Sequence, residues 1–304
     1  MCCVIEMEDA VANHFGGHLV KPQQMIGQNV AGAVVFMGLL SYHSMEKHLR
    51  TLADLKQRGA IIVLYVFDAW KVRETFYSLR TKVRSRVFAH AKLSNVCDHL
   101  LVPFEFCKAD FEPQEQAFVT VVPMGVDSTR VNGLNPARPI TLLAYGRQPE
   151  TLSAYLSQRL NDPATDTVMH HTDHYSIRSI DDFYAHRRHF WKLAQSSAVA
   201  LAYDPRATHP ERFSHSIVGQ RWFECLAAGC AVMGRRPVAP DADRLLDWQD
   251  ATIELPDDPV AAEAAILDLA RDTNRLAEIR ERNVANIKAR HEWHHRLAPI
   301  LAGL

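Results

Sequence analysis

The sequence has no long apolar run and no strong excess of charge. Its 304 residues carry 34 Lys and Arg against 35 Asp and Glu, a net charge of -1, so no overall field favours nucleic acid. The longest apolar runs, such as AIIVLYVF, are too short to cross a bilayer, and MCCVIEMEDA lacks the charged-then-apolar pattern of a signal peptide. We therefore expect a cytoplasmic protein with no transmembrane segment and no nucleic-acid partner.

Several functional motifs are also absent. The six cysteines form no Cys-x-x-Cys pair, and we expect buried free thiols. His170 with His174, and His186 with His189, have helical spacing, but no third ligand and no His-Glu-x-x-His accompany them, so we expect no metal. No Gly-x-Gly-x-x-Gly follows an apolar run, which argues against a dinucleotide-dependent oxidoreductase.

What the sequence does have is alternation between short apolar runs and longer segments with helical spacing. Continuous apolar runs predict strands that are buried on both faces, and the helical segments between them predict a parallel sheet. This pattern is typical of an α/β fold. The predicted strands are 33–38, 60–67, 98–103 and 117–123 in the first half, and 140–146, 166–172, 198–204, 230–234 and 251–255 in the second.

The alternation is interrupted once, near residues 127–138. This stretch, DSTRVNGLNPAR, carries Gly, Asn and Pro without periodicity, as linkers do. We therefore predict two Rossmann-like domains with parallel sheets. Their expected boundaries are 1–132 for the N-terminal domain and 133–290 for the C-terminal domain, with a terminal helix over 291–304.

Polar residues follow the strands of the second half, where α/β sheets bind their ligands. Gly146 allows a sharp turn after the strand 140–146, and Arg147 adds a planar cation there. Gly219 precedes a helix whose first N–H groups favour a phosphate. Glu224, one turn into that helix, can accept two hydrogen bonds from a vicinal diol such as a ribose. Together these residues predict a site for a nucleotide diphosphate.

Each of these features also has a plainer interpretation. Arg221 and Glu224 are three residues apart, so they could pair with one another on a solvated helix face. The flanking Trp222 and Phe223 argue against it, because they leave little surface for such a face.

Two other segments could likewise be ordinary structural elements without a ligand. Gly146 and Arg147 could form an ordinary turn with a surface arginine. In RRHFWKLAQSS, we expect an apolar side in the core, with a solvated face formed by Arg187, Arg188 and Lys192.

Five segments resemble one family in order along the chain. RWFECLAAGCAVMG, followed at a distance by HEWHHRLAPIL, is similar to the C-terminal signature of GT-B fold glycosyltransferases, in particular the group-1-like bacterial enzymes of the spore-maturation type. VPMGVD and AYGR are similar to the family's interdomain and Gly-Arg segments, and VFDAW to a loop of its first domain. The match runs through most of residues 60–300.

The resemblance implies a glycosyltransferase whose two domains face a cleft. The second domain would hold a nucleotide sugar, the first an acceptor of unknown kind, and no metal or other cofactor would be needed. Glu224 would bind the donor ribose, and Arg147 with the helix start at Gly219 would face the diphosphate. Arg221 matches the motif's arginine, and its partner could be phosphate or protein.

The sequence departs from the family pattern at one position. Many relatives have a glutamate that contacts the sugar eight residues before the helix glutamate, and here that position is Ser216. The donor sugar and the stereochemical outcome therefore stay open. The resemblance also implies a last helix that crosses back to the first domain, where we expect Trp293, Leu297 and Ile300 to pack.

Catalysis would need a base near the acceptor hydroxyl. Asp68 follows the strand 60–67 and is our candidate for the base or for orienting the acceptor. It could equally be the N-cap of a helix that begins near Lys71. His43, after the preceding strand, is the other candidate. Two further functions remain alternatives: a nucleotide-sugar epimerase of the same shape, and a non-catalytic nucleotide-sugar-binding protein.

Overall fold

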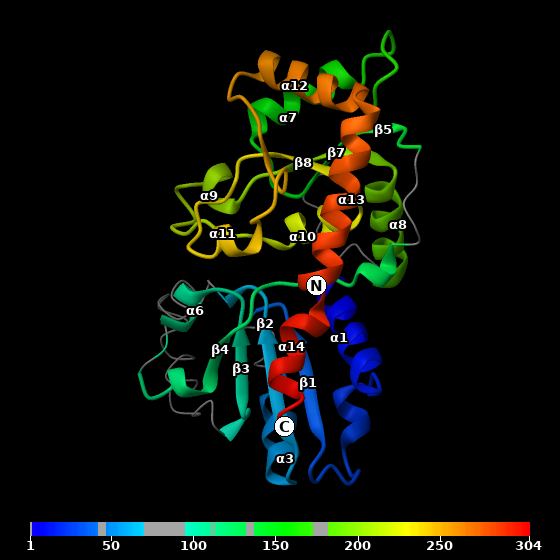
Figure 1. Ribbon diagram of the computed structural model, residues 1–304. Helices are drawn as coiled ribbons and strands as arrows, with labels where there is room; N and C mark the ends of the chain where they lie inside the picture. The colour runs from blue at the N-terminus through cyan, green and yellow to red at the C-terminus, as the bar shows by residue number, and fades with distance from the viewer. Residues whose placement is uncertain are drawn as a thin grey trace. The chain divides into compact units, whose positions relative to one another are not determined.

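The computed structural model describes residues 2–41, 47–69, 95–109, 111, 113–131, 137–172 and 182–304. The chain forms two compact units (Figure 1). The first contains residues 1–124 and 293–304, and the second contains residues 125–292. The division at 124 falls earlier than the predicted linker, because Val126 already pairs with Glu292 at the far end of the second unit.

The first unit is built on a parallel sheet in the order β1-β2-β3-β4. Its central strand β2 is almost wholly buried, as its uninterrupted apolar sequence predicts. The strands are β1 (Val34–Leu39), β2 (Ile61–Val66), β3 (His99–Val102) and β4 (Val119–Val121). The helices are α1 (Cys2–Phe15), α3 (Leu49–Gln57), α6 (Glu105–Ala109) and α14 (Trp293–Leu301), with 3₁₀ turns at Pro22–Met25 and Gln116–Phe118.

The last helix, α14, belongs to the first unit, as predicted. Trp293 is 1% exposed, and its ring lies 5.5 Å from that of Tyr65 and 5.7 Å from that of Phe67. Leu297 is fully buried, whereas Ile300 is only partly buried. The aromatic contacts fix α14 against the sheet, which is why the chain returns to its first unit at the end.

Helix α1 was not predicted from the sequence. It lies beside β1 (Figure 1), and it approaches this strand closely at Gly38. A Cβ atom at this position would lie 2.5 Å from Val4 Cγ1 and 2.6 Å from Met7 Cε. Glycine at position 38 is therefore what allows the helix to approach the strand.

The second unit contains a parallel sheet in the order β6-β5-β7-β8-β9. From β5 the chain first adds β6 on one side of the sheet and then β7, β8 and β9 on the other side. The strand order therefore reverses between β5 and β7, and in open α/β sheets ligands bind at such switch points. The predicted α/β class with two parallel sheets is confirmed. The strands are β5 (Ile140–Tyr145), β6 (Met169–Thr172), β7 (Ser197–Ala202), β8 (Ala231–Gly234) and β9 (Ile253–Glu254).

Helices cover this second sheet, with α7 packing on α12 and α10 on α13. They are α7 (Glu150–Leu160), α8 (Phe183–Gln195), α9 (Pro205–Thr208), α10 (Gln220–Ala227), α11 (Ala242–Leu245), α12 (Pro259–Arg271) and α13 (Thr273–Arg290), with a 3₁₀ turn at Ser128–Arg130. None of the five cysteines whose side chains are described forms a disulfide, and four of the five are buried. Among the described residues, no helix combines the length and the apolar character needed to cross a membrane.

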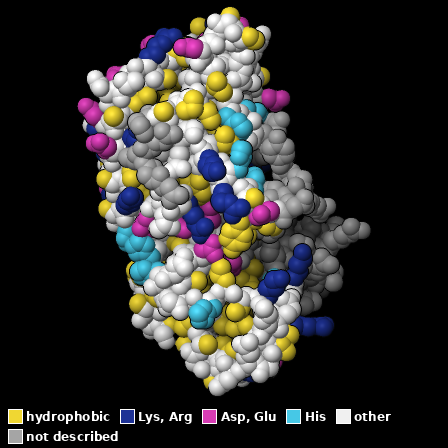
Figure 2. All heavy atoms as spheres, turned by 90° about the vertical axis from the view of Figure 1, so that its right-hand side faces the viewer, with side chains coloured by type: hydrophobic (Ala, Val, Ile, Leu, Met, Phe, Trp, Pro, Cys, Tyr) yellow, Lys and Arg dark blue, Asp and Glu magenta, His cyan; other side chains and the backbone are white. Residues whose placement is uncertain are grey.

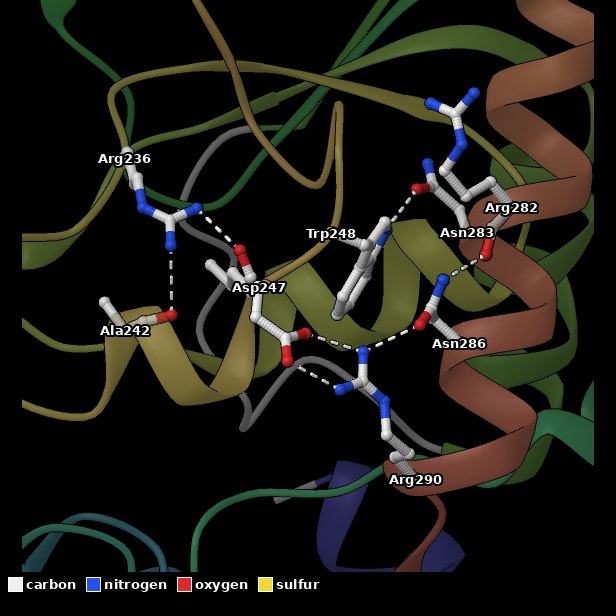
Figure 3. A network of polar contacts seen from close by, with 9 residues as sticks. Arg236, Ala242, Asp247, Trp248, Arg282, Asn283, Asn286 and Arg290 are labelled. Atoms are coloured by element: carbon white, nitrogen blue, oxygen red, sulfur yellow. Dashed lines mark hydrogen bonds and ion pairs between the residues drawn. The ribbon is translucent and has the colours of Figure 1, made fainter.

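Polar contacts tie α13 to the loop after α11 (Figure 3). The buried Asn283 accepts a hydrogen bond from Trp248 Nε1 at 2.8 Å. It also donates one to Cys230 O at 3.1 Å. Two turns later, Arg290 binds both Asp247 carboxylate oxygens at 2.7 and 2.9 Å and also contacts Asn286. Asn283 thus joins α13, the Trp248 loop and the start of β8.

Asn283→Ala should destabilise the second unit. It removes the hydrogen-bond partner of the partly buried Trp248 N–H and of the buried Cys230 C=O, at a cost of about 2 to 4 kcal/mol. Asn286→Ala, on the same helix but partly exposed, is the matched control, and water replaces its contacts at a cost below about 1 kcal/mol. Urea unfolding measures both changes in free energy. Equal losses in the two variants would contradict the role given to Asn283.

Candidate functional site

The switch point between β5 and β7 is occupied by the side chain of Arg221. Its Nη1 donates to Tyr203 O, just after β7, at 3.0 Å. Its Nη2 lies against Gly146, just after β5, where a Cβ atom would be only 2.6 Å away. Gly146 also has φ +65°, a conformation that glycine adopts without strain. Helix α10 therefore contributes a cation between the carboxyl ends of the two central strands.

Arg221 does not form the helical salt bridge with Glu224 that the spacing allowed. Its guanidinium lies 5.2 Å from the centre of the Tyr145 ring, a cation–π contact. Burial lowers the pKa of Arg221, with opposing contributions from Tyr145, Cys225 and Glu224. Its Nε is buried and has no hydrogen-bond partner among the described residues. The solvated-face alternative was therefore wrong.

Glu224 is a buried carboxylate with two partners from other elements. It is 3% exposed, and Oε1 lies 2.6 Å from Arg187 Nη2 of α8. Oε2 accepts a hydrogen bond from the Tyr145 hydroxyl at 3.0 Å. Burial raises the pKa of Tyr145 well above its usual value, so this hydroxyl keeps its proton and remains a donor. The carboxylate is thus fixed in position by a cation and a phenol.

Arg187 corrects one sequence prediction. We expected it on the solvated face of its helix, but its side chain is only 11% exposed and is paired with Glu224. Its guanidinium also lies 4.5 Å from the ring centre of Phe190 and 5.4 Å from that of Trp191. These positions are three and four residues further on, so the helical stripe itself could have identified Arg187. Arg188 and Lys192 are exposed, as predicted.

The N-terminus of α10 is open. Gly219 is its N-cap, with φ -84° and no side chain that caps the first N–H groups. A Cβ atom at Gly219 would meet nothing within 4 Å. Two buried acceptors, Gln220 Oε1 and Gln148 Oε1, have no hydrogen-bond partner among the described residues. Unpaired N–H groups and a positive helix end are the features that bind anions.

Arg147 is held by an aromatic ring. It is partly buried, and its guanidinium carbon lies 5.1 Å from the centre of the Phe213 ring. Phe213 comes from the loop that leads into α10. The side chain therefore packs on this loop at the carboxyl edge of the sheet instead of extending freely into solvent, which the plain-turn alternative had allowed.

The hydroxyl of Ser216 forms hydrogen bonds with other residues of the second unit. It is 8% exposed, and its hydroxyl donates to Asp204 Oδ2 at 2.6 Å while accepting from Val238 N at 2.9 Å. Asp204 in turn caps α9 through the N–H groups of Arg206 and Ala207. Ser216 thus joins the loop before α10 to the loops after β7 and β8. Its one proton is already used.

His170 of β6 and His186 of α8 lie beside this edge without adding positive charge near pH 7. The pKa of His170 is lowered by partial burial and by His189 and His171. Burial, with Arg187 and His189, also lowers the pKa of His186. Both imidazoles are therefore neutral near pH 7. The predicted partner His174 lies outside the described residues.

The two catalytic candidates belong to the first unit. Asp68 follows β2 at the carboxyl edge of the first sheet, and its backbone N–H donates to Leu40 O at 2.7 Å. It is partly exposed, as a group that meets an acceptor must be. His43 lies outside the described residues, as does the helix expected near Lys71.

A family comparison covers much of the second unit and the last helix. Residues 168–302 match a family described as glycosyl transferase-like. Over these residues the chain is similar to that family. The match includes Arg187, Ser216, Gly219, Arg221 and Glu224, and it confirms the resemblance deduced from the sequence motifs. It does not reach the finer spore-maturation type, which stays a prediction. No curated protein sequence matches the chain.

Among solved structures, similar chains include a mutant of S. aureus TarM in complex with Fondaparinux, alpha-GlcNAc-glycerol and UDP, at 11% identity and a TM-score of 0.47. It covers 86% of this chain, which spans only 57% of TarM. CalG4, the calicheamicin glycosyltransferase, has 14% identity and a TM-score of 0.43, with 92% of this chain and 75% of CalG4 covered.

The spinosyn rhamnosyltransferase SpnG, complexed with thymidine diphosphate, has 13% identity and a TM-score of 0.39, with 99% of this chain and 80% of SpnG covered. Similarity at such low TM-scores is too loose to carry a functional argument.

Removing one partner of the Arg187–Glu224 pair should strongly destabilise the second unit. Arg187→Met or Glu224→Gln alone leaves an unpaired buried charge, which costs about 3 to 5 kcal/mol. The double variant should lose less than the sum of both, with a coupling of about 1 to 3 kcal/mol. Urea unfolding of the four proteins measures this coupling.

Arg188→Met is the control for this cycle, because it removes a neighbouring but exposed arginine and should cost less than about 0.5 kcal/mol. Strict additivity of the two single changes would show that Arg187 and Glu224 do not stabilise one another.

Proposed function

We propose that the protein transfers a sugar from a nucleotide-diphosphate donor to an acceptor hydroxyl. One observation carries the proposal: the open N-terminus of α10 lies in a glycosyltransferase-like segment, and Arg221 of the same helix reaches the switch point of the sheet. Buried polar atoms without partners, such as Gln148 Oε1, adjoin this edge. In native proteins such atoms need an explanation, and a bound ligand is one.

The donor diphosphate would bind at Gly219. The free N–H groups of the first turn would donate to phosphate oxygens, and the helix dipole favours their negative charge. Arg147 would add a guanidinium, whose fork suits phosphate oxygens. When the sugar leaves, charge builds up on the diphosphate, so the same groups would stabilise the transition state. The proposal involves no metal ion.

Glu224 remains our candidate for the donor ribose. Its contacts with Arg187 and Tyr145 fix the orientation of the carboxylate, which a vicinal diol requires. Because only 3% of the residue is exposed, side chains around it must move before a ribose reaches it. Asp68 remains our candidate for the base that takes the proton of the acceptor hydroxyl.

A non-catalytic nucleotide-sugar-binding protein is the second candidate. The observation that favours it is the commitment of the Ser216 hydroxyl to Asp204 and Val238. In the resembling enzymes a glutamate that contacts the sugar stands at this position, and a serine held in this way offers the sugar no such carboxylate. Binding of the nucleotide would then occur without turnover.

Gly219→Asp should separate helix stability from ligand binding. An aspartate at the N-cap suits the helix, so the melting temperature should stay equal or rise by a few degrees. Its carboxylate repels a diphosphate, so titration calorimetry with UDP, GDP, ADP and dTDP should show binding of the recognised one weakened by more than about tenfold. Gly219→Asn, with the same size and no charge, should weaken it less.

The nucleosides lack phosphate and should bind all three proteins equally. A Gly219→Asp variant that binds every diphosphate as well as the unchanged protein does would place the diphosphate elsewhere.

Turnover distinguishes the enzyme from the binding protein. With the nucleotide sugar that binds, the unchanged protein should hydrolyse it slowly in the absence of an acceptor, and chromatography would follow the release of nucleoside diphosphate. Asp68→Asn should abolish this release while binding, measured by calorimetry, stays the same. Binding without any release would favour the second candidate, and unaltered release in Asp68→Asn would remove Asp68 from the reaction.

A further inference from the structure

The first unit contains a cavity that the proposed transfer reaction does not use. Its volume is about 590 Å³, and it lies among α1, the loop over residues 17–25, β1 and α3. Small-molecule sites occupy about 300 to 1,000 Å³, so the cavity is of that size. Its walls are largely apolar and include Val11, Phe15, Val34, Phe36 and Leu55.

The mouth of this cavity is unusually apolar for a protein surface. Phe15 is 40% exposed, Leu19 53%, Val20 51% and Val34 42%, and all four line the cavity. Figure 2 views the side that carries α1 and β1, where hydrophobic side chains reach the surface in several places. Exposed apolar groups that gather around one opening mark a binding site more often than single ones do.

One carboxylate lies in this apolar wall. Glu8 of α1 lines the cavity, and its Oε1 accepts a hydrogen bond from Gly38 N of β1 at 2.9 Å. Among the described residues no cation pairs with it, and its Oε2 accepts no hydrogen bond. Burial raises the pKa of Glu8 to about 6, against the Gly38 hydrogen bond and with a smaller contribution from Asp9. At pH 7 it is therefore mostly an uncompensated negative charge.

The other titratable groups on the cavity wall are His18, Lys21 and His48. His18 and Lys21 are exposed at the mouth, and the causes that shift the pKa of Glu8 include none of the three. Glu8 is partly buried and has one donor, Gly38 N–H, and a cation brought close to such a carboxylate stabilises its charge further. The missing complement is thus a cation that enters through an apolar mouth.

We propose that this cavity binds a small amphiphilic cation, in which an apolar chain or ring fills the space beside β1 and an ammonium group pairs with Glu8. The apolar part gains from burial against Phe36 and Leu55, and the ammonium gains a carboxylate that is already partly removed from water. The site lies wholly within the first unit, so the proposal does not depend on the donor site of the second unit.

The pairing fixes how affinity depends on pH. An alkylammonium stays charged between pH 5 and pH 8, whereas Glu8 loses its charge as the pH falls through about 6. Since the cation binds the ionised form, affinity should be greatest above pH 7. It should fall about tenfold by pH 5, where about a tenth of Glu8 is ionised.

The test is titration calorimetry of the full chain with dodecylamine, dodecanol and dodecanoate, each used below the concentration at which it forms micelles or separates from solution. Dodecylamine should bind at least about tenfold more tightly than the alcohol, and dodecanoate should bind least. Glu8→Gln keeps an acceptor for Gly38 N and should abolish both the preference for the amine and its pH dependence. Asp9→Asn, which removes the same charge from the same helix outside the cavity, should preserve both.

Ala12→Phe tests whether the probes bind in this cavity. Ala12 lines the cavity, so the larger side chain should fill part of it and weaken binding of the amine and the alcohol alike. Circular dichroism checks that each variant is folded. Equal binding of amine and alcohol, tighter binding of dodecanoate, an unchanged pH profile in Glu8→Gln, or no binding of any probe would each overturn the proposal.

Discussion

The burial of one carboxylate, Glu224, constrains most of the second unit. A charge removed from water must be compensated, and in this chain the compensation comes from Arg187 on α8 and Tyr145 at the end of β5. Helix α10 packs its apolar residues in the register that brings these groups together. The pair, with the Tyr145 hydroxyl, thus joins α8, β5 and α10 at one point.

That register also places the features of the candidate site. Arg221, three residues before Glu224, is carried to the switch point between β5 and β7, where only a glycine at position 146 leaves room for its guanidinium. The helix start at Gly219 is left open, and Ser216 is drawn back to Asp204. The donor site that we propose is thus a consequence of how the buried charges are satisfied, with the open helix start left for a ligand.

Strands and strand ends could be predicted because buried parallel strands have continuous apolar sequences, such as IIVLYV of β2 and SAVALA of β7. The tertiary contacts of individual side chains could not be predicted from the sequence. Arg187 and Glu224 are 37 residues apart in the sequence, so nothing local indicated that Arg187 is paired, and we expected it in solvent. For the same reason Arg221, which is only three residues from Glu224, was a plausible partner of that carboxylate. Helix α1 was missed although Val4, Met7 and Val11 have helical spacing and are buried, whereas its close approach to Gly38 is a tertiary contact that no local pattern signals.

The most direct test of the account is a crystal structure of the unchanged protein with a bound nucleoside diphosphate. The account predicts phosphate oxygens within hydrogen-bonding distance of the first N–H groups of α10, a guanidinium of Arg147 beside them, and the ribose at Glu224. A diphosphate bound away from Gly219, with the N-terminus of α10 still open, would contradict it.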